Sequence, residues 1–191
     1  MKRSLRTILV TATAAAGIIV GSPIAAAQPA PTPSPENAPP GPESEGQYCV
    51  ILVDKPSDPT AVSNEVFSAC SDTGIEDAEA QLRAEESTGA LAQRGASIQA
   101  SIPIMRWSEN LNNSSPYTVI YGQSGPCDTA GYNLNPNTYW APRITSMQGY
   151  NYCDVADMRQ LNGGLFQSRL LPLNYVGDPW NDNIGFIRVH S

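Results

Sequence analysis

The feature that most constrains the fold is a weak internal repeat in the last third of the chain. Three apolar positions recur forty residues later with the same spacing: Trp140, Ile144 and Met147 against Trp180, Ile184 and Ile187. Spacing that is repeated within one chain in this way indicates one supersecondary unit that is used twice. Both copies are short apolar stretches between turn residues and lack the period of a long helix. The sequence therefore predicts a β-rich C-terminal region built from two similar halves.

The four cysteines predict two disulfide bonds. An even number of cysteines in an oxidising compartment is typical of a disulfide framework. Four cysteines allow three pairings, and the spacing favours Cys49–Cys70 and Cys127–Cys153, each within one proposed module. A metal site is the competing interpretation. It is disfavoured because the chain has no C-x-x-C motif and its one histidine, His190, is the penultimate residue.

The N-terminal residues have the three parts of a secretory signal. Residues 1–6 are basic, residues 7–21 are apolar, and Ala25-Ala26-Ala27 supplies the small residues of a cleavage site. The apolar run is about 15 residues, which is shorter than the ~20 that a spanning helix needs. We therefore interpret residues 1–27 as a signal peptide and expect a secreted, extracellular protein without a membrane span after cleavage.

Residues 28–46 predict a disordered, Pro-rich linker. Seven prolines alternate there with small and polar residues, and no aromatic or branched aliphatic residue is present. Such a segment has too little apolar surface to offset the entropy lost on ordering. An extended spacer is the interpretation that we favour, although a docking site for a partner that recognises proline is the alternative.

Residues 47–115 predict a small α+β module closed by one disulfide. Tyr48–Asp54 is an apolar strand, and Val62–Cys70 is predicted to return beside it. A capping box of Thr73 and Glu76 predicts the start of a helix that ends near Gly89. The pattern from Ile98 to Trp107 is weaker and predicts a further short strand or an irregular segment.

Residues 116–191 predict an all-β domain. Tyr117–Tyr121 alternates like a half-buried strand. Residues 132–139 predict a loop with extended pieces, because Asn occupies every second position. The remaining strands are predicted at residues 143–148, 153–161, 166–173 and 184–190.

The C-terminal third resembles the βγ-crystallin Greek-key domain, in which two four-stranded motifs pack as a small sandwich. The resemblance rests on the paired Trp-x-x-x-Ile units and on four short motifs: Cys127-Asp128, Thr145-Ser146, Tyr152-Cys153 and Gly163-Gly164. The region is similar to secreted bacterial crystallin-like proteins that include metalloproteinase inhibitors and killer-toxin-like proteins. The resemblance implies a mostly β fold, with a C-terminal βγ-crystallin-like double Greek-key sandwich preceded by a small α+β segment.

The same resemblance implies a calcium site, which this sequence keeps only in part. The first copy keeps the hydroxyls of Thr145-Ser146 but has Ala141-Pro142 in place of the acidic pair. The second copy keeps Asn181-Asp182 but has Gly185-Phe186 in place of the hydroxyls. Calcium needs about six to eight converging oxygens. There are two interpretations: either the two halves combine into one degenerate calcium site, or these residues stabilise turns and strand ends. We expect no cofactor, or weak calcium binding at most.

The charge of the chain disfavours nucleic acid as a partner. The full sequence has 11 basic and 18 acidic residues, a net charge of −7. Three of the basic residues lie in the predicted signal, which leaves 8 against 18, or −10. No cluster of Lys or Arg remains to contact phosphates or an anionic membrane.

An extracellular binding protein is the function that the sequence favours over an enzyme. His190 lies one residue from the end, where a terminus is a poor place to preorganise a base. The resemblance favours an extracellular protein partner such as a protease. A disulfide-braced loop would then be the contact surface, because preorganisation lowers the cost of binding. The candidate residues are Asn133, Asn135, Asn137 and Tyr139. The alternative is a structural or cell-envelope-associated protein.

Overall fold

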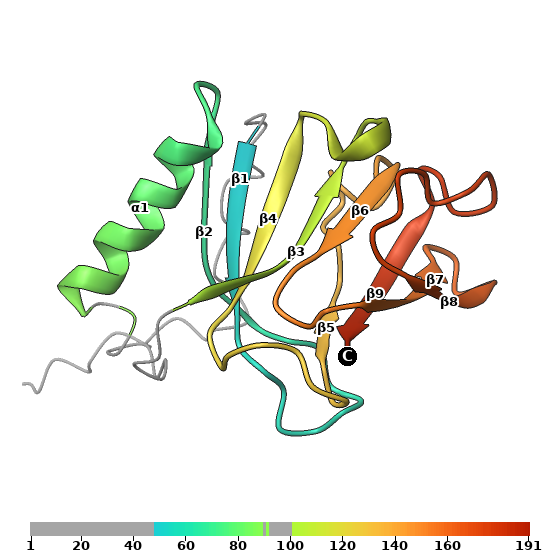
Figure 1. The fold of residues 1–191 in the computed structure, drawn as a ribbon, viewed down its shortest axis with the longest axis horizontal. Helices are drawn as coiled ribbons and strands as arrows, with labels where there is room; N and C mark the ends of the chain where they lie inside the picture. The colour runs from blue at the N-terminus through green and yellow to red at the C-terminus, as the bar shows by residue number, and fades with distance from the viewer. Residues whose placement is uncertain (1–47, 90, 92–100) are drawn as a thin grey trace, which may run out of the picture. The chain divides into compact units, whose positions relative to one another are not determined.

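The computed structural model describes residues 48–89, 91 and 101–191. The predicted signal peptide, the predicted linker and Ile98 lie outside the described residues. The described chain is mostly β, with two sheets and the helix α1 (Ile75–Thr88) (Figure 1). The strands are β1 (Tyr48–Val53), β2 (Glu65–Ser71), β3 (Ile102–Ser108), β4 (Tyr117–Gly122), β5 (Tyr132–Leu134), β6 (Ser146–Gly149), β7 (Val155–Gln160), β8 (Phe166–Leu170) and β9 (Ile184–His190), and a 3-10 turn, η2, spans Leu111–Asn113.

The five-stranded sheet, sheet A, joins the two segments that the sequence suggested as separate modules. Its order is β2-β1-β4-β3-β6, and β1 pairs with β4 in parallel while the other neighbours are antiparallel. β1 and β3 precede the predicted boundary between residues 115 and 116, whereas β4 follows it. Both sides of this boundary therefore contribute neighbouring strands to one sheet, within one compact unit.

The four-stranded sheet, sheet B, has the antiparallel order β5-β9-β7-β8. β5 belongs to sheet B although it lies in the chain between two strands of sheet A. Leu173 makes the reverse crossing, since it lies between β8 and β9 but exchanges backbone hydrogen bonds of 2.8 and 2.9 Å with Met147 of β6. Each half of the C-terminal region therefore sends one extended segment into the sheet of the other half.

The repeated apolar positions lie in the main core. All six are at most 3% exposed: Trp140, Ile144, Met147, Trp180, Ile184 and Ile187. The backbone repeats as well, because the N–H of Ala141 donates to Asn137 and the N–H of Asn181 donates to Gly177, both at 2.9 Å. The two copies thus share a turn, a buried Trp and a buried strand, as the internal repeat predicts.

α1 packs on β1 and β2 and forms a second, smaller core. Its buried residues, Ala78 and Leu82, lie against Val50 and Leu52, which alternate along β1 with the side chains that face the main core. The predicted capping box is wrong. Gly74 is the N-cap without a side-chain cap, because the Thr73 hydroxyl donates to the carboxylate of Asp77 instead of accepting from the backbone.

Several strand boundaries also differ from prediction. Residues 132–139 were expected to be a loop, yet their first three residues form β5. The strand expected from residue 143 begins at Ser146, because residues 140–143 complete the turn that follows Trp140. β2 begins at Glu65, three residues later than predicted. No helix in the described residues has both the length and the apolar character needed to cross a membrane.

Candidate functional site

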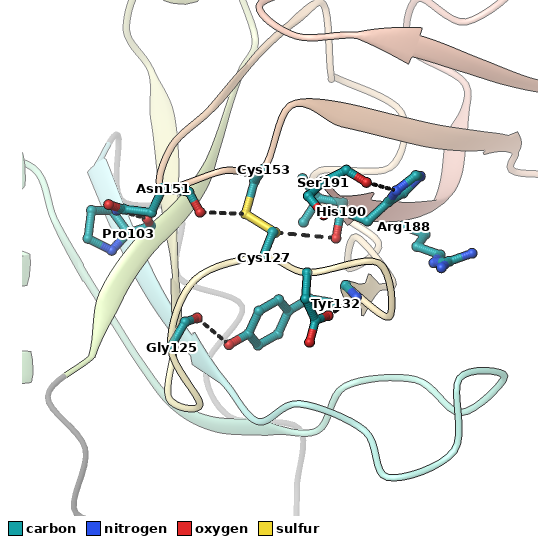
Figure 2. The surroundings of a disulfide bond; sticks show 12 residues. Pro103, Gly125, Cys127, Tyr132, Asn151, Cys153, Arg188, His190 and Ser191 are labelled. Atoms are coloured by element: carbon teal, nitrogen blue, oxygen red, sulfur yellow. Dashed lines mark hydrogen bonds between the residues drawn. A yellow bond between two sulfur atoms is a disulfide. The ribbon is translucent and has the colours of Figure 1, made fainter.

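The structure contains both predicted disulfides. Cys49–Cys70 joins residues that lie directly opposite each other in β1 and β2. Cys127–Cys153 joins the loop before β5 to the segment that leads into β7 (Figure 2). Cys127 is 6% exposed and Cys153 is fully buried. The two disulfides are consistent with an extracellular location.

Hydrogen bonds around Cys127–Cys153 hold the loop in place. The N–H of Cys127 donates to the carbonyl of Asn151 at 3.1 Å, and the Asn151 amide donates to the carbonyl of Pro103 at 2.7 Å. The Tyr132 hydroxyl donates to the carbonyl of Gly125 at 2.7 Å (Figure 2). Burial is the main cause that raises the pKa of Tyr132 to about 12. The loop is therefore fixed to β3, to β5 and to the start of β7.

Asp128 gives this loop one strongly ionised group. Its carboxylate lies 2.6 Å from Lys55 Nζ and accepts from the backbone N–H groups of Gly131 and Ala130. The hydrogen bond from Lys55, followed by that from Gly131, lowers the pKa of Asp128 to about 2. The Asp128 side chain is 58% exposed, so solvent screens the pair. Its effect is to fix the position of the β1–β2 loop against the loop before β5.

Asn133 of the predicted binding loop is a structural residue. It is 2% exposed, and its side-chain amide donates to the carbonyls of Pro59 and Ala61 at 2.8 and 2.6 Å. Its backbone pairs with Ser63, whose N–H donates to the Asn133 carbonyl at 2.8 Å and whose hydroxyl oxygen accepts from the Asn133 N–H at 3.2 Å. Asn133 therefore joins β5 to the β1–β2 loop, and its side chain is turned toward that loop and not toward solvent.

Two other residues of that predicted loop are exposed at its surface. Asn135 and Asn137 are both exposed, and the side-chain oxygen of Asn137 accepts a hydrogen bond from the N–H of Trp140 at 2.9 Å. Tyr139 is half-buried and packs edge-on against Trp140, with the Arg143 guanidinium 4.2 Å from its ring centre. Of the four predicted binding residues, Asn135 and Asn137 are therefore the two whose side chains are exposed.

Asn135 and Asn137 border a groove where β1 and β4 of sheet A meet the end of β5. We call this the β1–β5 groove. Its rim holds exposed side chains, one apolar and three charged or polar: Val62, Glu65, Asn135 and Asn137. Its floor consists of apolar side chains that are buried or half-buried: Ile51, Val53, Trp107, Ile120 and Leu134. Sequence reasoning missed this floor, because its members come from β1, β3, β4 and β5 and no local pattern connects them.

Ser146 is not available as a calcium ligand. It is fully buried, and its hydroxyl donates to the carbonyl of Asn110 at 2.5 Å and accepts from the N–H of Asn113 at 2.9 Å. Asn113 and its neighbour Asn112 both have positive φ, 55° and 57°. The serine therefore fixes the strained turn η2 onto β6, which is a structural role.

The other three residues of the predicted calcium site form an incomplete set of oxygens. Thr145 and Asn181 line one shallow hollow beside η2. Asp182 is exposed, and its carboxylate already accepts from the Asn181 amide at 2.8 Å. In the described part of the chain, no three His, Cys, Asp or Glu residues cluster as a metal site would require. These residues fit calcium poorly, because the ion needs about six to eight oxygens.

We therefore expect calcium to bind more weakly than about 1 mM, the weak end of the range for extracellular sites. Calorimetric titration of the purified chain with calcium measures this directly. Asp182→Asn, which removes the one carboxylate of the set, should leave the titration unchanged. A sub-micromolar dissociation constant that is lost in Asp182→Asn would contradict the expectation.

His190 lies in an ordered strand, which corrects the assumption that it is on a free end. It belongs to β9 opposite Val155, and its Nε2 lies 3.3 Å from the Asp157 carboxylate without the alignment of a hydrogen bond. The Ser168 hydroxyl donates a hydrogen bond to the Asp157 carboxylate, and the Arg188 guanidinium lies 3.8 Å from the same carboxylate. The Asp157 carboxylate thus contacts both the Ser168 hydroxyl and the His190 imidazole. A serine nucleophile needs direct contact with its base, which is a different arrangement.

Comparisons with protein-family models, with curated proteins and with solved structures found no match for this chain.

Proposed function

We propose that this chain is a secreted, non-enzymatic binding protein of βγ-crystallin-like fold, and that its partner is an extracellular protein. The exchange of extended segments between the sheets supports the fold, since β5 and Leu173 cross in opposite directions between two similar halves. The signal pattern of residues 1–27 and the two disulfides support secretion.

The observation that carries the binding function is the β1–β5 groove. An apolar floor with a polar rim is the arrangement in which a partner buries one apolar side chain and orients it by hydrogen bonds. Asn135 and Asn137 offer both donors and acceptors, and Glu65 offers an acceptor. The groove is also preorganised, because Asn133 fixes its β5 side to the β1–β2 loop. Rigid walls reduce the entropy lost on association.

A protease is the partner class that we propose first. Inhibition needs a rigid surface that occludes an active site and survives the contact, and two disulfides brace the groove and the loop beside it. The resemblance to crystallin-like metalloproteinase inhibitors favours the same class. Fold-level resemblance by itself does not define a site, so the groove is the part to be tested.

The test is capture of partners from the culture medium of the producing organism by the immobilised mature chain, followed by activity assays on any protease recovered. Val62→Arg places a long charged side chain at the rim of the groove, where Val62 is 41% exposed. We expect it to weaken partner binding at least about tenfold, because a charged side chain at the rim would obstruct the apolar floor on which the partner packs. Leu111→Arg is the matched control, because Leu111 is 52% exposed on η2, outside the groove.

Equal binding by Val62→Arg and the unmodified chain would exclude the groove as the contact surface. Capture of no partner, together with firm association of the protein with the cell envelope, would favour the structural function instead.

A further inference from the structure

β8 is an open edge in a protein whose other sheet edges are protected. The opposite edge of sheet B, β5, is covered by Ser63, and the β6 edge of sheet A is covered by Leu173. The remaining edge, β2, carries exposed Glu65 and Ser68. Charged and polar residues are the usual protection of an edge strand. β8 ends sheet B, its one charged residue, Arg169, is half-buried, and it has neither a covering segment among the described residues nor a bulge in its ladder with β7.

The backbone of β8 presents an unpaired row of hydrogen-bonding groups. Leu165 accepts from Gln160 at 3.1 Å and Leu171 donates to Asp154 at 2.8 Å, which fixes the residues that bond to β7. Bonded and non-bonded positions alternate in an antiparallel ladder. The N–H and C=O groups of Phe166, Ser168 and Leu170 therefore point away from β7, and no partner for them is found among the described residues.

Apolar side chains accompany this unpaired backbone. Phe166 is 56% exposed and Leu170 is 73% exposed, and the hairpin that leads into β8 adds Leu161 and Leu165 at 56% and 55%. Four of the eight large apolar side chains exposed in the described residues thus lie on one hairpin. An unpaired edge with exposed apolar side chains is a template for addition of another strand.

We propose that β8 pairs with β8 of a second copy of this chain about a twofold axis at Ser168, which joins the two B sheets into one. In this register Phe166 lies opposite Leu170 of the second copy, and Ser168 lies opposite its own equivalent. All three outward positions become hydrogen-bonded pairs, so the six free groups of each strand are satisfied together. Phe166 and Leu170 share a face of the strand, and each gains an apolar cross-strand neighbour.

Charge is compatible with a second copy as the occupant. The chain without its predicted signal is acidic, with 8 basic and 18 acidic residues, or −10, so most surfaces of two copies repel each other. β8 has no acidic residue, and its one charged residue, Arg169, lies opposite Gln167 of the second copy in this register. A twofold axis at Gln167 would instead place Phe166 opposite Ser168 and Leu170 opposite Gly164, which lies before β8. The register at Ser168 therefore matches the apolar side chains better.

The oligomeric state of the purified secreted chain, measured by sedimentation equilibrium over a wide concentration range, tests the pairing. We expect a monomer–dimer equilibrium. Ser168→Pro removes one outward N–H from each strand, and because this N–H is not used by β7 the monomer should remain folded. We expect the dimer dissociation constant to rise at least about tenfold. Ser168→Ala is the matched control, because it keeps the N–H and should keep the dimer.

Leu170→Gln is the second variant and does not depend on how proline is tolerated. It removes two cross-strand apolar contacts per dimer without adding charge, and should raise the dissociation constant about fivefold. A cysteine at the twofold axis tests the register, since hydrogen-bonded pairs have Cα atoms about 5.5 Å apart, within disulfide range. Ser168→Cys should therefore cross-link under mild oxidation, whereas Leu161→Cys should not.

A chain that stays monomeric at every concentration would overturn the proposal. A dimer that survives both Ser168→Pro and Leu170→Gln would overturn it as well, and so would equal loss of the dimer in Ser168→Ala and Ser168→Pro.

Discussion

Gly149→Ala should be among the most destabilising single substitutions in the protein. A Cβ added to Gly149 lies 1.7 Å from the carbonyl oxygen of Cys153 and 2.9 Å from a methyl of Leu171. The first neighbour is backbone, in a turn where Cys153 donates its N–H to Tyr150 at 3.0 Å, so it cannot move without opening the turn. We expect a loss of about 3 kcal/mol or more in the free energy of unfolding, measured by urea denaturation.

Gly163→Ala is the control for this prediction. Gly163 has a φ of +72°, and no atom lies within 4 Å of an added Cβ, so its cost is conformational alone, about 1 kcal/mol. A Gly149→Ala variant no less stable than Gly163→Ala would show that the turn at residues 150–153 does not pack against β6 as described.

The sequence predicted features that depend on local or repeated patterns. The repeated Trp and Ile positions indicated two similar halves. The same positions are buried in the structure, where each copy has the same turn around its Trp. Cysteine spacing likewise indicated the two pairs that the structure contains. In both cases the spacing of a few residues was sufficient for the prediction.

The features that the sequence did not predict depend on contacts between distant segments. β5 is three residues long, and the Asn residues in and after it favour a loop. Its pairing with β9 and with Ser63 holds it as a strand. The parallel pairing of β1 with β4 has no hairpin turn to indicate it, because parallel strands need a long connection. The capping prediction failed for a local reason, since Asp77 competes for the Thr73 hydroxyl.

The candidate site also combines features that local patterns predict with features that depend on contacts between distant segments. Asn135 and Asn137 were predicted from the loop composition and lie at the rim of the β1–β5 groove, but the adjacent Asn133 is buried. Alternate Asn residues do not reveal which of them will be covered. The covering segment is the β1–β2 loop, which is distant in the sequence. The apolar floor that gives the groove its binding character depends on this long-range packing as well.

Replacing Cys127 and Cys153 together by Ala should destabilise the protein more than replacing Cys49 and Cys70. The separations are 26 and 21 residues, so loop-closure entropy contributes about 3 kcal/mol in both cases. The ladder between β1 and β2 still holds the segments around Cys49 and Cys70 together, whereas the loop of Cys127 has no such ladder to the segment of Cys153. Cys127 and Cys153 are also both buried, whereas Cys70 of the other pair is half-buried, so removing the first pair leaves the larger cavity.

We therefore expect urea denaturation to show a loss of about 3 to 5 kcal/mol for the Cys127→Ala, Cys153→Ala pair and about 2 to 3 kcal/mol for the Cys49→Ala, Cys70→Ala pair. The first pair should also weaken partner binding, since the loop at Cys127 reaches β5 through Tyr132 and β5 forms one side of the groove. The reverse order of stabilities would mean that the β1–β2 ladder depends on its disulfide. The α1 layer, and not the loop before β5, would then be the part of the fold that needs a covalent link most.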